Sequence, residues 1–122
     1  SDSDAEAETA IKVETKPGII VGTIGYMSPE QVRGSPVAPQ TDVFSFGVVL
    51  YEMLTGKQPF EGETPSDVMA AILTREPKPL DEFNLPIPVE LKKIVEKTLR
   101  KNKRKRYQRA GELHDDLRQL KR

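Results

Sequence analysis

The chain has 122 residues, of which 36% are hydrophobic and 31% are charged. Its 19 basic and 19 acidic side chains balance, which excludes steering toward nucleic acid or an anionic membrane by net charge. The absence of cysteine excludes disulfides, thiol nucleophiles and cysteine zinc sites, and no apolar run is long enough for a membrane span or a signal peptide. We therefore expect a soluble, cytoplasmic segment from one domain.

Residues 1–21 are acidic and rich in small side chains, and they turn mildly apolar after Pro17. This composition predicts a mobile segment that becomes ordered near Ile19. Thr9 and Thr15 are candidate phosphorylation sites here, because a phosphate can order a loop through an arginine partner. The alternative is that both are simply tolerated in a mobile tail.

The next segment, residues 22–34 (GTIGYMSPEQVRG), is interrupted by glycine and proline and predicts neither a helix nor a strand. Its strongly polar groups before Glu30 are the hydroxyls of Thr23, Tyr26 and Ser28. We expect a loop that presents a surface instead of filling a core.

Four helices are predicted after this loop. The first covers residues 41–54 and ends at Gly56, which is typical of a helix C-cap. The second runs from Pro65 to about Thr74, with Thr64 as its N-cap. Apolar stripes at helical spacing predict the other two, from about Val89 to Arg100 and from about Ala110 onward.

The helix over 41–54 is apolar in almost every direction around its axis, which is typical of a helix buried inside a large protein or a membrane. Fourteen residues are too few to span a bilayer. We therefore expect other elements to surround this helix and the chain to be part of something larger.

Three motifs then carry a resemblance: GTIGYMSPE, twelve residues further on DVFSFGVVLYEMLTGKQPF, and near the end KNKRKRYQRAGEL. Together they resemble the C-terminal part of a serine/threonine protein kinase domain of the bacterial type, over residues 22–122. The resemblance implies a mainly α fold, the C-terminal-lobe portion of the kinase fold, with about four main helices and an irregular activation-segment loop. Residues 1–21 would belong to the activation loop, 22–34 would dock substrate and 41–122 would form the helical part.

The resemblance also implies roles for single residues. Gly22, Thr23 and Tyr26 would contact the protein substrate, and Thr23 would also hold the catalytic aspartate and its companion lysine. Asp42 would anchor the catalytic loop by accepting its backbone N–H groups. Read without the resemblance, Thr23 is an ordinary turn residue and Asp42 an acid favoured in a first helical turn. Phe44 departs from the family pattern, which has tryptophan in many members.

Glu30 and Arg106 match two kinase motifs that meet in an ion pair, with Asn102 replacing the usual aspartate before the arginine. Arg104 is the nearest rival for this partnership. The alternative for Arg106 is one more solvated charge in the basic run 100–106.

The same basic run opens a second class of function, a binder of nucleic acid or of an anionic surface. Only Tyr107 is available beside it for base stacking, and there is no groove-entering motif, so no nucleic acid is expected as a partner. His114 has no second ligand at metal-site spacing and is predicted to lie on a helix surface.

Phosphoryl transfer needs a glycine-rich phosphate cover, a strand lysine, a catalytic aspartate and asparagine, and a metal-binding aspartate. None of these motifs occurs in the chain. The resemblance therefore implies that ATP, Mg²⁺ and transfer to protein Ser/Thr belong to a complete domain whose missing N-terminal part is the main partner, and that this chain is inactive alone. A non-catalytic pseudokinase or scaffold module is the remaining alternative.

Overall fold

The computed structural model describes residues 22–120, and all regular structure within this range is helical. Thr9 and Thr15 lie outside the described residues, as does the whole of the acidic 1–21 segment. No helix among the described residues is long and apolar enough to cross a bilayer.

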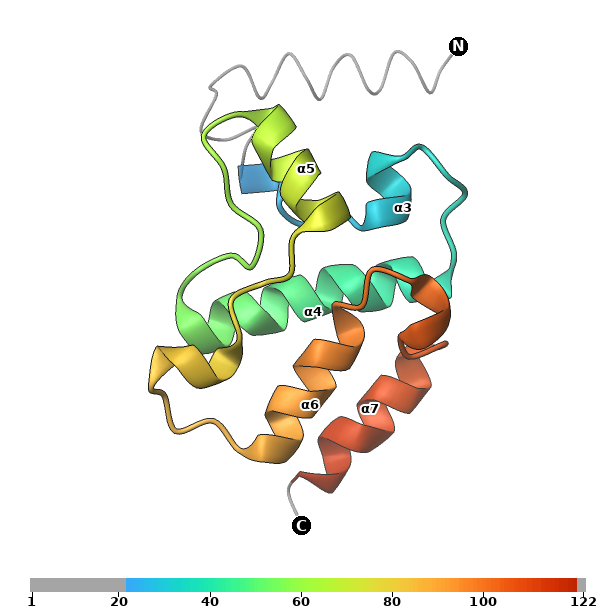
Figure 1. Ribbon diagram of the computed structural model, residues 1–122. Helices are drawn as coiled ribbons and strands as arrows, with labels where there is room; N and C mark the ends of the chain where they lie inside the picture. Colours follow the sequence, from blue (N-terminus) through green and yellow to red (C-terminus); the bar gives the residue numbers. More distant parts are fainter. Residues whose placement is uncertain (1–21, 121–122) are drawn as a thin grey trace.

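The longest helix, α4 (Pro39–Thr55), runs through the middle of the fold (Figure 1). Two helices pack on one side of it and on each other, α6 (Val89–Thr98) and α7 (Ala110–Gln119). The short α3 (Pro29–Val32) and α5 (Pro65–Thr74) contact each other on the other side. This arrangement confirms the predicted mainly α fold with four main helices.

Local sequence signals explain where α4 begins and ends. Pro39 occupies its first turn, and the hydroxyl of Thr41 accepts a hydrogen bond from the backbone N–H of Ala38 at 3.0 Å. The helix ends at Gly56, whose φ of 76° lies in the left-handed region that favours glycine. The predicted start at residue 41 is therefore wrong by two residues, because Pro39 suits a first helical turn.

The predicted bounds of α5 are confirmed, and Thr64 caps it by accepting from the N–H of Asp67 at 3.1 Å. Helix α6 stops at Thr98, before the predicted Arg100. Two short 3₁₀ helices complete the described elements: η1 (Leu80–Phe83) precedes α6 and η2 (Lys103–Lys105) follows it.

Two hydrophobic clusters form the core. The larger surrounds the inner side of α4, where Phe44 stacks on Phe60 with ring centroids 5.8 Å apart. Its other buried members are Val48, Tyr51, Val68, Ala71, Ile72, Leu80, Val95 and Leu99. The smaller cluster joins α4 to α6 and α7 through Val43, Ile94, Tyr107 and Leu113.

Helix α4 comes unusually close to α6 at Gly47. A Cβ atom added there would lie 2.0 Å from the Thr98 hydroxyl oxygen, which is far inside contact distance. Thr98 is itself fully buried, and its hydroxyl donates to the carbonyl of Val95. The absence of a side chain at Gly47 therefore sets the spacing of the two helices.

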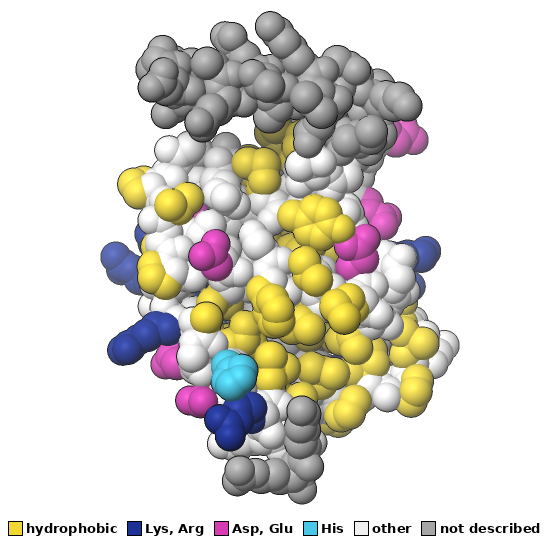
Figure 2. Space-filling model, turned by 180° about the vertical axis from the view of Figure 1, so that it is seen from behind, with side chains coloured by type: hydrophobic (Ala, Val, Ile, Leu, Met, Phe, Trp, Pro, Cys, Tyr) yellow, Lys and Arg dark blue, Asp and Glu magenta, His cyan; other side chains and the backbone are white. Residues whose placement is uncertain are grey.

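The described elements surround only part of α4, which agrees with the expectation that the chain is part of something larger. Phe46, Val49 and Met53 form a row at helical spacing and are 43%, 39% and 76% exposed. We call this row the α4 stripe. Figure 2 shows hydrophobic side chains gathered over one face of the molecule. The described part of the chain thus leaves one side of α4 uncovered.

Candidate functional site

The 22–34 segment is more regular than its sequence predicts. Residues 22–24 are helical, and α3 follows after a turn. Ser28 begins α3 with a capping box: its hydroxyl accepts from the N–H of Gln31 at 3.2 Å, and the Gln31 side chain accepts from the N–H of Ser28 at 2.9 Å. The prediction of no helix here is therefore wrong for Pro29–Val32, because the cap and the proline together favour a helical turn.

Three side chains tie this segment to α4 and to the loop after it. The hydroxyl of Tyr26 donates to the carboxylate of Glu52, and this hydrogen bond raises the pKa of Tyr26. The hydroxyl of Ser45 donates to the Tyr26 carbonyl at 2.8 Å. The amide of Gln58 donates to the carbonyl of Gly22 at 3.1 Å. The segment is thus held at Gly22 and at Tyr26.

The two glycines of the GTIG sequence serve different needs. A Cβ at Gly25 would lie 2.4 Å from the side-chain oxygen of Gln58, so Gly25 makes room for that tether. Among the described residues, a Cβ at Gly22 would meet nothing within 4 Å. Thr23 is exposed, and its carbonyl accepts from the N–H of Tyr26 at 3.2 Å.

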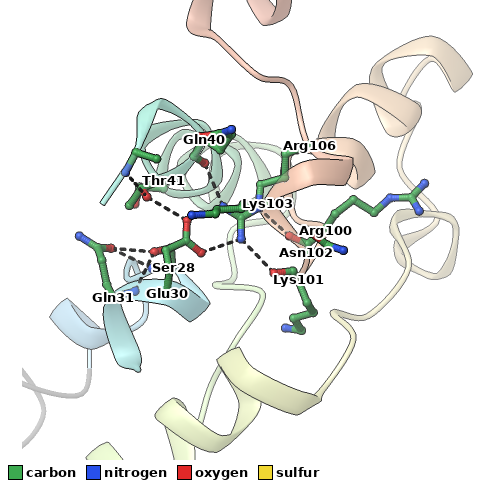
Figure 3. Close-up of polar contacts among 12 residues, drawn as sticks. Ser28, Glu30, Gln31, Gln40, Thr41, Arg100, Lys101, Asn102, Lys103 and Arg106 are labelled. Carbon is green, nitrogen blue, oxygen red and sulfur yellow. Dashed lines mark hydrogen bonds and ion pairs between the residues drawn. The ribbon is translucent and has the colours of Figure 1, made fainter. Parts of the chain in front are cut away.

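Glu30 and Arg106, 76 residues apart in the sequence, face each other in a bidentate ion pair (Figure 3). The two terminal guanidinium nitrogens of Arg106 donate to the two carboxylate oxygens of Glu30, at 2.7 and 2.8 Å. Both residues are buried, with 2% of Arg106 and 5% of Glu30 exposed. Parallel hydrogen bonds of this kind are the strongest that arginine makes with a carboxylate.

Arg106 finds a partner for every one of its five N–H groups. Besides Glu30, it donates to the backbone carbonyls of Arg100 at 2.6 Å, Gln40 at 3.0 Å and Lys101 at 3.1 Å. Its guanidinium carbon also lies 4.9 Å from the centre of the Phe44 ring. One side chain thereby joins the segment after α6 to the start of α4 and to α3.

The pKa of Glu30 is lowered from 4.5 to about 2. Burial alone raises the pKa of a carboxyl group, but the hydrogen bonds from Arg106, from its own backbone and from Thr41 outweigh it. The Thr41 hydroxyl donates to Glu30 at 2.9 Å. Sequence reasoning missed Thr41, although a threonine in the first turn of a helix is a common capping residue.

The basic run 100–106 does not form one charged surface. Arg106 is buried and Lys101 half-buried, whereas Arg100, Arg104 and Lys105 are exposed. Figure 3 shows the Arg100 side chain extending away from Glu30. Within the described residues, Glu30 has no ion pair with Arg104, the rival partner.

Asn102 takes a local role at the position where the aspartate of the family pattern would stand. Its side chain accepts from the backbone N–H of Arg104 at 2.9 Å and caps η2. This fixes the short turn that brings Arg106 back toward Glu30.

Asp42 is exposed in the first turn of α4, and it borders an apolar groove of about 350 Å³. Phe46 of the α4 stripe and His114 of α7 line the same groove, and His114 is exposed as predicted. Figure 2 shows the single histidine of the chain at the edge of the hydrophobic face. The other lining residues are Val43, Ala110, Leu113 and Leu117.

No cluster of three or more His, Asp or Glu side chains among the described residues is placed to hold a metal ion.

Comparison with known proteins places residues 7–117 in the family described as the protein kinase domain. The chain is 39% identical over 117 residues to a probable serine/threonine-protein kinase of Clostridium acetobutylicum, covering 96% of this chain. It is 43% identical over 103 residues to the serine/threonine-protein kinase PknB of Mycobacterium leprae, covering 84% of this chain. In both cases the chain spans only 17% of the relative's length.

A solved structure resembles the chain as well. The twitchin kinase region from C. elegans matches with a TM-score of 0.68 and 28% sequence identity. The match covers 80% of this chain and 17% of the twitchin chain.

Proposed function

Because the chain belongs to the protein kinase family, we propose that it is the substrate-docking and helical part of a domain that transfers the γ-phosphoryl group of ATP to protein serine or threonine. The observation that carries the proposal is the buried ion pair between Glu30 and Arg106, which holds the 22–34 segment on the helices. The chain spans 17% of its relatives, so ATP, Mg²⁺ and the catalytic groups are assigned to the rest of such a domain.

In this proposal the 22–34 segment receives the substrate polypeptide. No described residue would contact a side chain at Gly22, and Thr23 beside it is an exposed residue. Tyr26 is held by Glu52 and shapes the floor of the docking surface. Thr23 also orients the catalytic aspartate that accepts the proton of the substrate hydroxyl.

The uncovered side of α4 is the proposed contact with the rest of the domain. Asp42 is exposed beside an apolar groove, an arrangement that suits a carboxylate accepting backbone N–H groups from an incoming loop. The α4 stripe supplies apolar surface next to it. The missing N-terminal part of the domain is therefore the expected partner, and protein substrates bind only to the assembled domain.

A hybrid kinase tests the proposal. The aligned part of Mycobacterium leprae PknB is replaced by this chain, and phosphorylation of a protein substrate is measured with labelled ATP. We expect an active hybrid, and we expect Thr23→Ala and Asp42→Asn each to lower kcat by about 100-fold, the scale of a misplaced catalytic group.

Matched controls are Thr74→Ala and Asp115→Asn, exposed residues of α5 and α7 that should leave kcat unchanged. A folded hybrid without activity would favour the scaffold or pseudokinase alternative. Equal activity in all four variants would contradict the roles assigned to Thr23 and Asp42. The chain by itself should show no binding of ATP with Mg²⁺ by titration calorimetry. Saturable binding would contradict the assignment of ATP and Mg²⁺ to the rest of the domain.

A further inference from the structure

A second cavity lies apart from the 22–34 segment, where the connection from α5 to η1 passes the end of α6. Its volume is about 530 Å³, within the range typical of small-molecule sites. Much of its wall is apolar, formed by Tyr51, Pro77, Pro79, Leu80, Val95 and Leu99. The hydroxyl of Tyr51 donates to the carbonyl of Lys78 at 2.7 Å, which ties this connection to α4.

Positive charge exceeds negative charge around the cavity. Four cations line it, Lys78, Arg100, Lys101 and Lys105, against two acids, Glu76 and Glu96. Within the described residues, none of the four cations forms an ion pair. A cavity with apolar walls and surplus unpaired cations is complementary to an anion.

Lys101 is half-buried, whereas the other three cations are exposed. Its ammonium lies 3.9 Å from the centre of the Phe60 ring and donates to the carbonyl of Ala71 at 3.3 Å. An ammonium group has three donors, so two remain for a ligand. Burial lowers the pKa of Lys101 to about 8; the charge of Glu76 opposes this shift and the charge of Arg106 adds to it. An anion in the cavity would favour the charged form of Lys101.

We propose that this cavity binds a small organic anion, a carboxylate on an apolar body, with Lys101 contacting the carboxylate and the apolar wall covering the body. Inorganic phosphate would pair with the cations but leave the apolar wall of the cavity exposed to water. A neutral apolar molecule would cover that wall but leave the cations unpaired. None of the lining residues belongs to the 22–34 segment, so the site is separate from the proposed substrate-docking surface.

The probe is decanoate at concentrations below micelle formation, titrated into the 122-residue chain and followed by calorimetry and by amide chemical shifts. We expect saturable binding, with the largest shifts in residues 76–80 and 99–105. Decanol has the same apolar body without charge and should bind about tenfold more weakly or worse. Decylammonium should not compete. Equal affinity for decanoate and decanol, or shifts centred on the α4 stripe, would overturn the proposal.

Lysine variants test which ammonium group contacts the carboxylate of decanoate. Lys101→Met keeps an apolar stem over Phe60 but removes the ammonium, and should weaken decanoate binding by about tenfold. Lys93→Met is the matched control, because Lys93 is exposed on α6 and does not line this cavity, and its affinity should stay within about twofold.

If Lys101→Met fails to fold, the exposed pair Arg100→Gln with Lys105→Gln gives the same test with little risk to the core. Both cations line the cavity, so their joint removal should also weaken binding. An unchanged affinity in these variants would show that the cations do not recognise the ligand and would reject the site.

Discussion

Arg106 makes five hydrogen bonds inside the protein, so its replacement leaves several buried groups without partners. We expect Arg106→Met or Glu30→Gln to lower the free energy of unfolding by about 3 kcal/mol, the typical cost of breaking a buried ion pair from one side. Arg104→Gln, two residues away and exposed, should cost less than about 0.5 kcal/mol. Urea denaturation measures each change.

A double-mutant cycle separates the pair from its surroundings. The combined variant should lose less stability than the sum of the two single losses. Reversal of the charges, Glu30→Arg with Arg106→Glu, should recover part of the loss. Strict additivity would mean that the two side chains act independently.

The lowered pKa of Glu30 makes stability depend on pH in a defined direction. Since the folded value of about 2 lies below the ordinary 4.5, this group stabilises the fold fully above pH 4.5 and loses its contribution as pH falls toward 2. Denaturation curves across this range should show a steeper loss for the unaltered chain than for Glu30→Gln. Parallel losses would contradict the assigned pKa.

At the level of residues, the partners Glu30 and Arg106 were predictable only because two motifs resembled those of a family. Periodicity and composition alone favoured a solvated charge for Arg106, since it stands in a basic run. Thr41 was not predictable as a donor to Glu30, because that contact depends on how α3 packs beside α4. Tertiary contacts of this kind leave no local pattern.

Between elements, Gly47 on α4 packs directly against Thr98 on α6. Gly47→Ala should lower the free energy of unfolding by about 1–3 kcal/mol, because the new methyl group overlaps the Thr98 hydroxyl and the two helices must move apart. Gly111→Ala is the matched control: it lies in α7 with open space around it, and should be neutral or stabilising by up to about 1 kcal/mol. Thermal melts of both variants test the contrast, and an equal effect would contradict the steric explanation.

The bounds of a helix were predictable where a residue next to the helix end marks it, and not where the end depends on tertiary contacts. The cap at Thr64 and the left-handed Gly56 are both local signals, and both were read correctly. The end of α6 was placed too late: the helix stops at Thr98, and the carbonyls of Arg100 and Lys101 beyond it accept from Arg106. These hydrogen bonds depend on how the chain folds back after α6, which no local sequence signal predicts.

Taken as a whole, the molecule exposes the α4 stripe, and we expect the chain to associate as its concentration rises. Each large apolar side chain left in water forgoes roughly 1 kcal/mol or more of burial. Replacement of Phe46, Val49 and Met53 by serine, threonine and glutamine should reduce light scattering and the binding of an apolar dye. Val37→Thr with Val89→Thr changes exposed residues outside the stripe and should have little effect. A chain that stays monomeric and binds no dye would contradict the expectation.

The overall architecture followed from the sequence because helical periodicity and family motifs both act over long stretches. The sequence also predicted that α4 is apolar almost all round, but not which side the described residues would cover. That choice depends on the docking of α6 and α7, which no single segment encodes.

The separation of 76 positions between Glu30 and Arg106 in the sequence has a consequence for the order of folding. Closing so long a loop costs chain entropy before any contact compensates for it, whereas the helices between the two residues form from near neighbours. We therefore expect the ion pair to close late, after α4 and α6 have docked. A contact that forms after the transition state governs the rate of unfolding more than the rate of folding. Arg106→Met should then speed unfolding more than it slows folding in stopped-flow kinetics, so that the ion pair sets how long the chain stays folded once its helices have assembled.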